Sequence, residues 1–265
     1  NHTPQEYSMF GVGDYRTDCL RVVYPNGGQA VDLRYDSHKI YDGKPQLKGL
    51  PAVYCGDENA QTLEIVLKDC VSEIRVVLLY SVFENYDMIA RSARIENGTQ
   101  ETVFLDSALT GCIDYPTAGY DLLTFYGRHA KERSLERTAL RHGKIRVDSV
   151  RGASSHQQNP FAILCDPNTD ETKGECYGFS LLYSGNFAIT AEVDQLNRAR
   201  IAVGINPDGF YWKLNSGETF QTPEMVFSYS ADGLGKLSRN YDKMYQNNLC
   251  RGKFKMKRRA ILINK

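Results

Sequence analysis

Short apolar runs, most of them alternating with polar residues, follow one another along nearly the whole chain. Residues 62–67 and 88–95 alternate between apolar and polar positions, and residues 74–83 form a longer, more apolar run. Alternation with a period of two puts successive side chains on opposite faces of a strand. Further strand-like runs, bounded by Gly, Pro, Asn, Asp or Ser, cover residues 122–126, 161–165, 177–183, 187–193, 200–205, 210–214 and 224–229. Many short strands joined by turns predict an antiparallel sandwich or barrel.

Two turn signals predict which neighbouring strands pair. The turn Pro25-Asn26-Gly27-Gly28 separates residues 19–24 from residues 30–35, and Asn97-Gly98 separates residues 88–95 from residues 103–113. Asn and Gly tolerate the positive φ that tight turns require. We therefore expect a β-hairpin at each position.

One segment near the carboxyl terminus has helical periodicity. Its apolar positions are Leu234, Leu237, Tyr241, Met244, Tyr245 and Leu249. This spacing of three or four predicts a helix with one apolar face. We expect Asp232 or Ser230 to cap its start and Gly252 to close its end. The apolar run 260–264 that follows suits a strand buried on both faces, which needs partner strands, so the chain looks truncated there.

The charge balance excludes several partners. The 265 residues carry 32 Lys and Arg and 32 Asp and Glu, which gives no electrostatic reason to expect a nucleic-acid partner. A basic stretch at residues 251–259 is interpreted as a solvated segment between domains. No apolar run approaches eighteen residues, so we expect no membrane span, and Asn1-His2-Thr3-Pro4 does not resemble a signal peptide.

The seven cysteines have no regular spacing and no Cys-x-x-Cys pair. Several lie within apolar runs, as Cys165 does after Ala162-Ile163-Leu164. We interpret them as reduced, buried thiols, which indicates a cytoplasmic protein.

No catalytic, cofactor-binding or metal-binding residue can be assigned from the pattern. Gly11-Val12-Gly13 lacks the third glycine of a dinucleotide loop, and Gly152-Ala153-Ser154-Ser155-His156 lacks the strand and helix that flank a hydrolase nucleophile. The five histidines form no metal-binding pair. Paired carboxylates perform glycoside hydrolysis, but spacing alone singles out no pair among the acidic residues.

Trp212 is the candidate for ligand contact by an aromatic ring. It lies in the run Phe210-Tyr211-Trp212-Lys213-Leu214. An exposed ring would serve as a sugar-binding platform and would make the chain an autonomous carbohydrate-binding module. We favour packing of Trp212 in the core against a facing sheet.

Several ordered stretches carry distinctive residue patterns. They are Leu-Arg-Tyr-x-Ser-His-x-Ile-x-x-Gly-Lys-Pro-x-Leu-x-Gly-Leu-Pro-Ala at 33–52, Arg-Gly-Ala-Ser-Ser-His-Gln-Gln-Asn-Pro-Phe at 151–161, Tyr-Gly-Phe-Ser-Leu-x-Tyr-Ser-Gly-Asn-Phe at 177–187, Gly-Ile-Asn-Pro at 204–207, Trp-Lys-Leu at 212–214, Phe-Gln-Thr-Pro-Glu at 220–224 and Arg-Arg-Ala-Ile-Leu-Ile-Asn at 258–264. Together they span nearly the whole chain, and they resemble the amino-terminal region of bacterial glycoside hydrolase family 36 α-galactosidases (melibiases).

The resemblance implies a fold and a division of the chain. Residues 1–230 would form an antiparallel β-supersandwich without its first strands, and residues 231–257 a linking helix and connector. Residues 258–265 would begin a (β/α)₈ catalytic barrel, with 261–264 as its first strand. Since barrel active sites lie at the carboxyl ends of the strands, no catalytic residue of the family has a counterpart here.

The resemblance also implies a function for the parent chain. Family members hydrolyse terminal α-galactosyl groups of melibiose and raffinose with retention and need no cofactor. The segment alone is expected to be inactive, and its implied partners are the barrel of the same chain, further subunits of a homo-oligomer and the α-galactoside substrate. Sheet edges left without their missing strands would favour self-association.

The stretch Ser154-Ser155-His156-Gln157-Gln158-Asn159 is expected to hold a loop by hydrogen bonds. We interpret His156 as the centre of that network and keep His156, Gln157, Asn159 and Trp212 as candidates for contact with sugar at the rim of the parent's site. A remote alternative is an aldose epimerase, whose chemistry requires a histidine and a carboxylate in one cleft, here His156 and Glu192.

Overall fold

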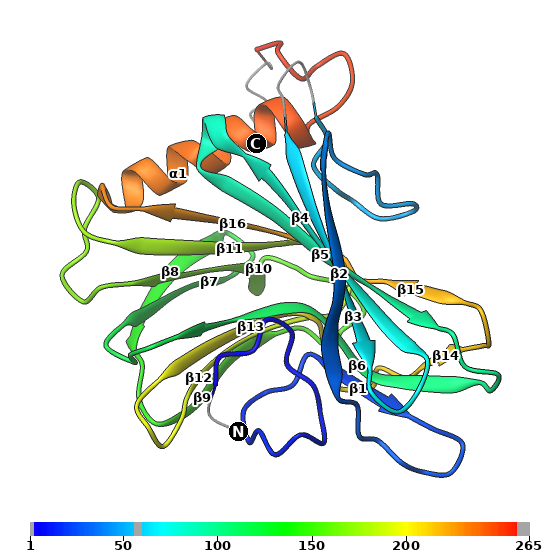
Figure 1. Ribbon diagram of the computed structural model, residues 1–265. Coiled ribbons are helices and arrows are strands. Elements are labelled where there is room, and N and C mark those ends of the chain that lie inside the picture. The colour runs from blue at the N-terminus through cyan, green and yellow to red at the C-terminus, as the bar shows by residue number, and fades with distance from the viewer. Residues whose placement is uncertain (1–2, 56–59, 259–265) are drawn as a thin grey trace.

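The computed structural model describes residues 3–55 and 60–258 and consists of two facing antiparallel sheets (Figure 1). In spatial order the smaller sheet contains β1 (Leu20–Val23), β6 (Val103–Tyr115), β13 (Ala199–Ile205), β12 (Phe187–Val193) and β9 (Gly143–Asp148), with β14 (Trp212–Leu214) also paired to β6. The larger sheet contains β2 (Leu33–Asp42), β3 (Gln61–Asp69), β4 (Ile74–Phe83), β5 (Met88–Asn97), β16 (Glu224–Ser230), β11 (Cys176–Leu182), β10 (Gln158–Cys165), β7 (Asp121–Arg128) and β8 (Lys131–Ala139), with β15 (Thr219–Gln221) also paired to β5. The predicted mainly-β, antiparallel supersandwich is confirmed.

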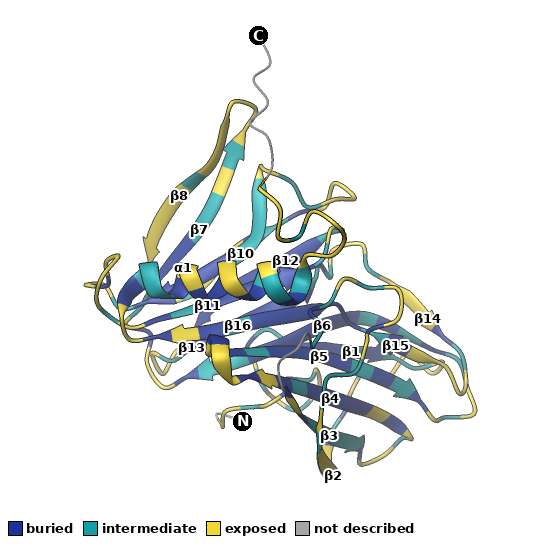
Figure 2. Cartoon of the chain, turned by 90° about the horizontal axis from the view of Figure 1, so that it is seen from above, coloured by how far each residue is buried: buried dark blue, intermediate teal, exposed yellow. Residues whose placement is uncertain are grey.

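Two apolar clusters fill the space between the sheets. One packs Leu78 and Ile95 of the larger sheet against Leu105 of β6, and the other packs Phe179 against Ile189 of β12. Each fully buried side chain of this size stabilises the fold by about 1.5–3 kcal/mol. Figure 2 shows the buried interior of the sandwich and the exposed strand β8 at its edge.

A helix covers part of the outer face of the larger sheet. α1 (Gly233–Met244) continues into a π-helical turn, η2 (Tyr245–Leu249), which confirms the helix expected from the periodicity. Leu237, Tyr241 and Met244 face the sheet and are buried. Gly178 of β11 allows this approach, because a Cβ there would lie 2.7 Å from the Tyr241 ring.

The expected helix caps are corrected in part. The Asp232 side chain makes no capping hydrogen bond. Instead the Ser230 hydroxyl accepts from the Asp232 N–H at 3.1 Å and donates to the Gly233 carbonyl at 3.1 Å. Gly252 has a φ of +87°, but the helical turns have already ended at Leu249, so Gly252 does not close the helix.

Both predicted hairpins are wrong. The turn at residues 24–28 forms, with the Gly27 N–H donating to the Tyr24 carbonyl at 2.9 Å, but β1 pairs with β6 while β2 pairs with β3 in the other sheet. β5 and β6 likewise belong to opposite sheets. The actual hairpin partner of β5 is β4, and a short 3-10 helix, η1 (Glu84–Tyr86), connects them. A turn signal reports a reversal of the chain and does not say whether the strands remain in one sheet.

The first strand of the expected barrel, at residues 261–264, lies outside the described residues. The division of the chain at residue 230 also stays a prediction.

Candidate functional site

Trp212 is half exposed, which contradicts the expectation that it packs in the core. Its side chain is 49% accessible and its ring lies 5.2 Å from that of Phe220. The neighbouring Tyr211 is 59% accessible and stacks on Phe104 at 4.7 Å. On the three-residue strand β14, Leu214 is the residue that enters the core.

The loop before β10 is held by hydrogen bonds, but His156 takes no part in them. His156 is exposed and has no hydrogen bond with any residue in the described ranges. Gln157 accepts a hydrogen bond from the Arg151 guanidinium, and the Asn159 amide donates to the Phe125 carbonyl of β7 at 3.1 Å. The sequence analysis missed Asn186, whose side chain accepts from the Gly152 N–H at 2.7 Å.

The geometry separates His156 from Glu192. The loop lies beside the turn that precedes the first residue of β12, where the Ser154 N–H donates to the Ser184 carbonyl at 2.8 Å. Glu192 is the sixth residue of β12, roughly 16 Å further along the strand. Its carboxylate already accepts from the N–H and the hydroxyl of Thr17, each at 2.7 Å. This arrangement does not provide the cleft that an epimerase requires.

A buried ionic cluster attaches the amino-terminal segment to the outer face of the smaller sheet. Arg200 Nε lies 2.6 Å from Asp114 Oδ1, and its Nη2 lies 3.2 Å from Asp14 Oδ2. Arg16 Nη2 contacts Asp14 at 2.8 Å, and Arg16 Nη1 contacts Asp114 at 3.1 Å. Burial acts to raise the pKa of the Asp14 carboxyl, but the Arg16 hydrogen bonds and the Arg200 charge hold this pKa below its usual value. These carboxylates are saturated by guanidinium groups, which indicates a structural role.

Other chemistry is sparse in the part of the chain that the structure describes. No group of three His, Cys, Asp or Glu residues there is arranged to hold a metal ion, and none of its helices is long and apolar enough to span a membrane. The seven cysteines are free thiols. Burial raises the pKa of Cys165 to about 11 and that of Cys176 to about 12, so these two thiols are poor nucleophiles.

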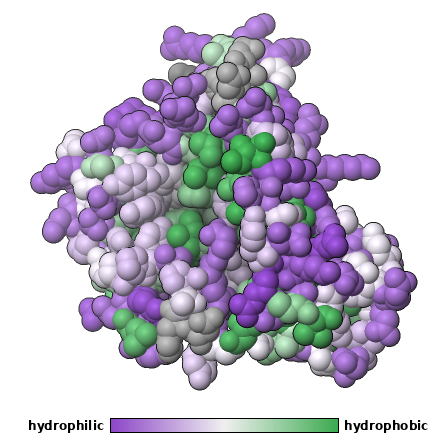
Figure 3. Space-filling model, in the orientation of Figure 1, coloured by the Kyte–Doolittle hydropathy of each residue, from purple (hydrophilic) through white to green (hydrophobic). Residues whose placement is uncertain are grey.

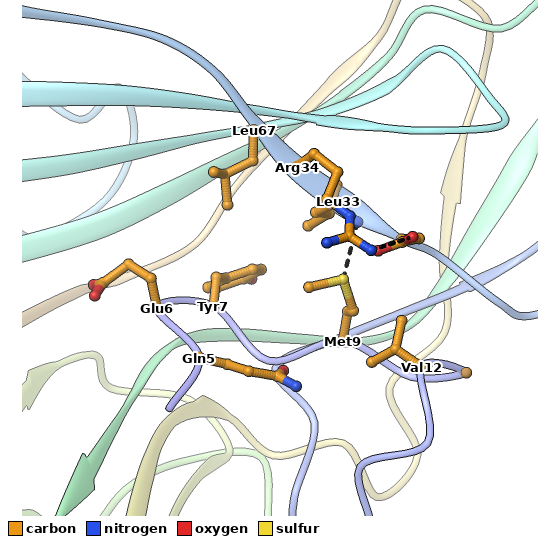
Figure 4. Close-up of a pocket in the computed structure, with 10 residues that line it drawn as sticks. Gln5, Glu6, Tyr7, Met9, Val12, Leu33, Arg34 and Leu67 are labelled. Carbon is orange, nitrogen blue, oxygen red and sulfur yellow. Dashed lines mark hydrogen bonds and ion pairs between the residues drawn. The ribbon is translucent and has the colours of Figure 1, made fainter. Parts of the chain in front are cut away.

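A cavity of about 450 Å³ lies between the amino-terminal segment and the edge strand β2 (Figure 4). Tyr7, Met9 and Leu67 contribute its apolar lining. Its ion pair joins Arg34 to Asp32 at 2.9 Å, with Arg34 70% accessible. Among the residues that the structure describes, no histidine, cysteine or serine lines this cavity, so they supply none of the usual nucleophile and base pairs.

A second network of hydrogen bonds joins residues 43–55 to the residues that follow α1. We call residues 245–258 the connector. The Tyr54 N–H donates to the Asn248 carbonyl at 2.8 Å, and the Asn248 amide donates to the Tyr54 carbonyl at 2.9 Å. The Tyr54 hydroxyl donates to the Cys250 carbonyl at 2.9 Å and accepts from Lys255 at 3.0 Å. The Arg251 guanidinium lies 4.1 Å from the centre of the Tyr54 ring, within range of a cation–π interaction.

A buried ion pair holds the other end of this segment. Lys44 Nζ lies 2.6 Å from Glu224 Oε2 on β16, and the two side chains are 3% and 2% accessible. The other carboxylate oxygen of Glu224 accepts from the Val53 N–H at 2.7 Å. Burial raises the pKa of the Glu224 carboxyl above its usual value, although the Lys44 charge opposes this. Residues 43–55 therefore attach the connector to the larger sheet.

Beyond this attachment the connector is largely exposed. Most of residues 251–258 are exposed, and hydrophilic side chains gather around them at the top of the molecule (Figure 3). The arrangement can position the chain that leaves α1.

The fold and this site define an accessory β-supersandwich region with an anchored carboxyl-terminal connector. The model of the glycosyl hydrolase family 36 N-terminal domain matches residues 1–215, and the melibiase model matches residues 219–265. The chain belongs to the glycosyl hydrolase family 36 N-terminal domain family.

The sequences of similar proteins align with almost the whole chain. It is 47% identical to the bifunctional α-galactosidase/sucrose kinase AgaSK of Mediterraneibacter gnavus and 48% identical to the α-galactosidase AgaA of Geobacillus stearothermophilus, in each case over 98% of this chain. It covers 28% and 36% of those proteins, so it spans about a third of their length. The crystal structure of the Geobacillus stearothermophilus α-galactosidase AgaB superposes with a TM-score of 0.95 at 47% identity, covering 97% of this chain and 36% of that one.

Proposed function

We propose that this chain is the non-catalytic amino-terminal part of an α-galactosidase that removes terminal α-galactosyl groups from oligosaccharides such as melibiose and raffinose with retention. The observation that carries the proposal is the family match over nearly the whole chain. Solved relatives from Geobacillus stearothermophilus are complexes with raffinose and with stachyose, which supports this substrate class.

The buried carboxylates support a non-catalytic role. A retaining glycosidase needs two carboxyl groups about 5–5.5 Å apart, one of them free to attack and the other to transfer a proton. Asp14, Asp114 and Glu224 are each neutralised by Arg or Lys. The catalytic pair would come from the barrel of the same chain, with the connector fixing where that barrel begins.

The proposed enzyme has three further properties: its location, its oligomeric state and its independence of cofactors. The enzyme is cytoplasmic, because its cysteines are free thiols. It is a homo-oligomer, because β2 is an exposed edge strand. It uses no organic cofactor or metal for the chemistry, since retaining hydrolysis by two carboxyl groups needs neither.

The experiment compares the 265-residue chain with its full-length parent for release of nitrophenol from a nitrophenyl α-galactoside. We expect activity in the parent and none in the segment. Turnover by the purified segment that survives a second purification would contradict the proposal, because a catalytic pair would then lie among these strands.

A second candidate, an autonomous carbohydrate-binding module, is favoured by the exposure of Tyr211 and Trp212. Titration of the segment with raffinose, monitored by Trp212 fluorescence, tests it. Saturable quenching, together with loss of raffinose binding by calorimetry in Trp212→Ala, would support the module, and an unchanged spectrum would reject it.

A further inference from the structure

An apolar row crosses the outer face of the larger sheet and extends beyond the strands that α1 covers, which are β16 and β11. The ring of Tyr241 on α1 lies 5.0 Å from the ring of Phe161 on β10. The ring of Phe161 lies in turn 5.6 Å from that of Phe125 on β7. Leu135 of β8 is paired with Phe125 across the two strands, so it lies on the same face. The row therefore runs from the helix to the edge of the sheet.

The side chains of this row become more exposed with distance from the helix. Tyr241 is 4% accessible, Phe161 and Phe125 are partly buried, and Leu135 is 54% accessible. Together they line a groove of about 420 Å³ between α1 and the hairpin β7–β8, which we call the helix-side groove. Leu164 of β10 points to the opposite side, into the core between the sheets. The outer face of an antiparallel sheet is polar where it faces water, so an apolar groove here indicates a surface that packs against something else.

The two walls of the helix-side groove match different family models. The N-terminal domain model covers β7, β8 and β10, whereas the melibiase model covers residues 219–265, which contain α1 and the connector. The packing of α1 on the outer face is therefore already a contact between the two matched regions. The groove continues this contact along the same sheet, from β11 towards β8.

We propose that the helix-side groove receives the domain that follows residue 265 in the parent enzyme. This inference rests on the proposed function, in which the catalytic barrel follows the connector. The connector tethers that domain to α1, so the domain meets the groove at a far higher effective concentration than a second copy of the chain does. The similar proteins are about three times as long as this chain, which leaves ample surface for such a contact.

The rim of the groove defines the chemistry of the surface that fits it. The α1 side is acidic, with Asp242 on the helix and Glu171 in the loop whose carbonyl accepts from the Gly235 N–H at 3.0 Å. The β8 side is basic, with Arg133. An apolar ridge with a cation facing α1 and a carboxylate facing β8 is therefore complementary to the groove.

The test measures how fast an introduced thiol reacts in the full-length parent. Leu135→Cys places a thiol in the groove, and Glu136→Cys places one on the opposite face of the same strand as the matched control. The native enzyme is treated with iodoacetamide, and peptide mass spectrometry separates each introduced thiol from the seven native cysteines. We expect the thiol at position 135 to react about tenfold more slowly than the thiol at position 136, because it must wait for the contact to open. In urea the two rates should be equal.

Leu135→Lys provides a second readout. A lysine in a covered groove should lower the Tm of the parent by about 2–4 °C, because its charge would be buried without a partner. Leu196→Lys is the control, since Leu196 is a leucine of similar exposure, 52%, in the turn between β12 and β13. It should leave the Tm unchanged.

Equal reaction rates of the two thiols in the native parent would overturn the proposal. Protection at position 135 that disappears on dilution would also overturn it, because a second copy would then cover the groove. Hydrolysis of a nitrophenyl α-galactoside is measured on the same samples. Activity with an unprotected thiol would contradict the docking alone, and protection without activity would contradict the proposed function alone.

Discussion

Lys44 and Glu224 form an ion pair of 2.6 Å between a loop and a central strand, with both side chains nearly inaccessible to water. The desolvation of two charges offsets much of their attraction, so the pair contributes little net stability, but removal of one partner leaves the other buried and uncompensated. The pair therefore fixes where residues 43–55 lie on the sheet.

Lys44→Met should lower the free energy of unfolding by about 3–5 kcal/mol at pH 7, measured by urea denaturation. The folded-state pKa of Glu224 is already raised, and loss of the ammonium group raises it further. A raised carboxyl pKa means that the folded state binds more protons. The loss of unfolding free energy in Lys44→Met should therefore grow as the pH rises above the usual carboxyl pKa.

The double variant with Glu224→Gln should recover stability, and Lys173→Met at an exposed pair should change it little. A deficit independent of pH would contradict this account.

Asp14→Asn should show the opposite dependence on pH. The folded pKa of Asp14 is lowered, so its stabilisation is present above the unfolded pKa and is lost as the pH falls through the folded value. The difference in unfolding free energy between parent and variant should be largest near neutral pH and should shrink on acidification. Urea denaturation over a pH series measures this, and a difference that widened in acid would refute it.

Gly178→Ala tests whether α1 needs its close packing against the larger sheet. The added Cβ would lie 2.7 Å from the Tyr241 ring, which would displace the helix and cost about 1–3 kcal/mol. Thermal unfolding should show a lower Tm. Gly119→Ala is the control, because its Cβ would meet Thr117 at an ordinary 3.6 Å. Equal Tm values for the two variants would mean that α1 adjusts without cost.

Tyr54→Phe tests whether the connector positions the rest of the enzyme. The variant keeps the ring beneath Arg251 but loses the hydroxyl bonds to Cys250 and Lys255. In the full-length parent we expect kcat/KM for a nitrophenyl α-galactoside to fall about tenfold, since small displacements of a site are costly. The Tm of the 265-residue chain should hardly change, which separates positioning from global stability. Tyr15→Phe, at an 84% exposed ring, should have no effect on either quantity.

Ile40→Lys tests association through the edge strand β2. Ile40 is 66% exposed there, and a charge on an edge strand opposes pairing with another edge. We expect the segment to self-associate in light scattering and Ile40→Lys to remain monomeric. A monomeric parent segment at high concentration would exclude this edge as an interface.

Most strands with a buried side were predicted, but β9 was missed although its Val147 lies in the core and its Ile145 packs against it. Residues 74–83 and 187–193 were predicted as strands and match β4 and β12. β8 was missed because nearly all of its side chains are exposed, so its sequence Lys-Glu-Arg-Ser-Leu-Glu-Arg-Thr-Ala carries no apolar face. The strand partners of β1 and β5 could not be predicted from turns, because the facing sheet competes for each strand.

The candidate site was predictable only in part. The stretches that resemble the family contain Lys44 and Glu224, but they lie 180 positions apart by number, and nothing local to either residue indicates that they pair. An ionisable residue within a strand of apolar neighbours, such as Glu224 before Met225 and Val226, was the available signal of a buried partner. Tyr54 carried no such signal, since its contacts depend on the path of the connector.

The hydrogen bond between Asn248 and Tyr54 joins residues separated by 194 positions. During synthesis on the ribosome, residues 43–55 emerge long before the partner that completes their bonding, and contacts of such long range form slowly. In a nascent chain, residues 43–55 would thus lack these hydrogen bonds until the connector leaves the exit tunnel. These hydrogen bonds would then form only as the connector emerges, which makes completion of the contacts of residues 43–55 a late event in the synthesis of the chain.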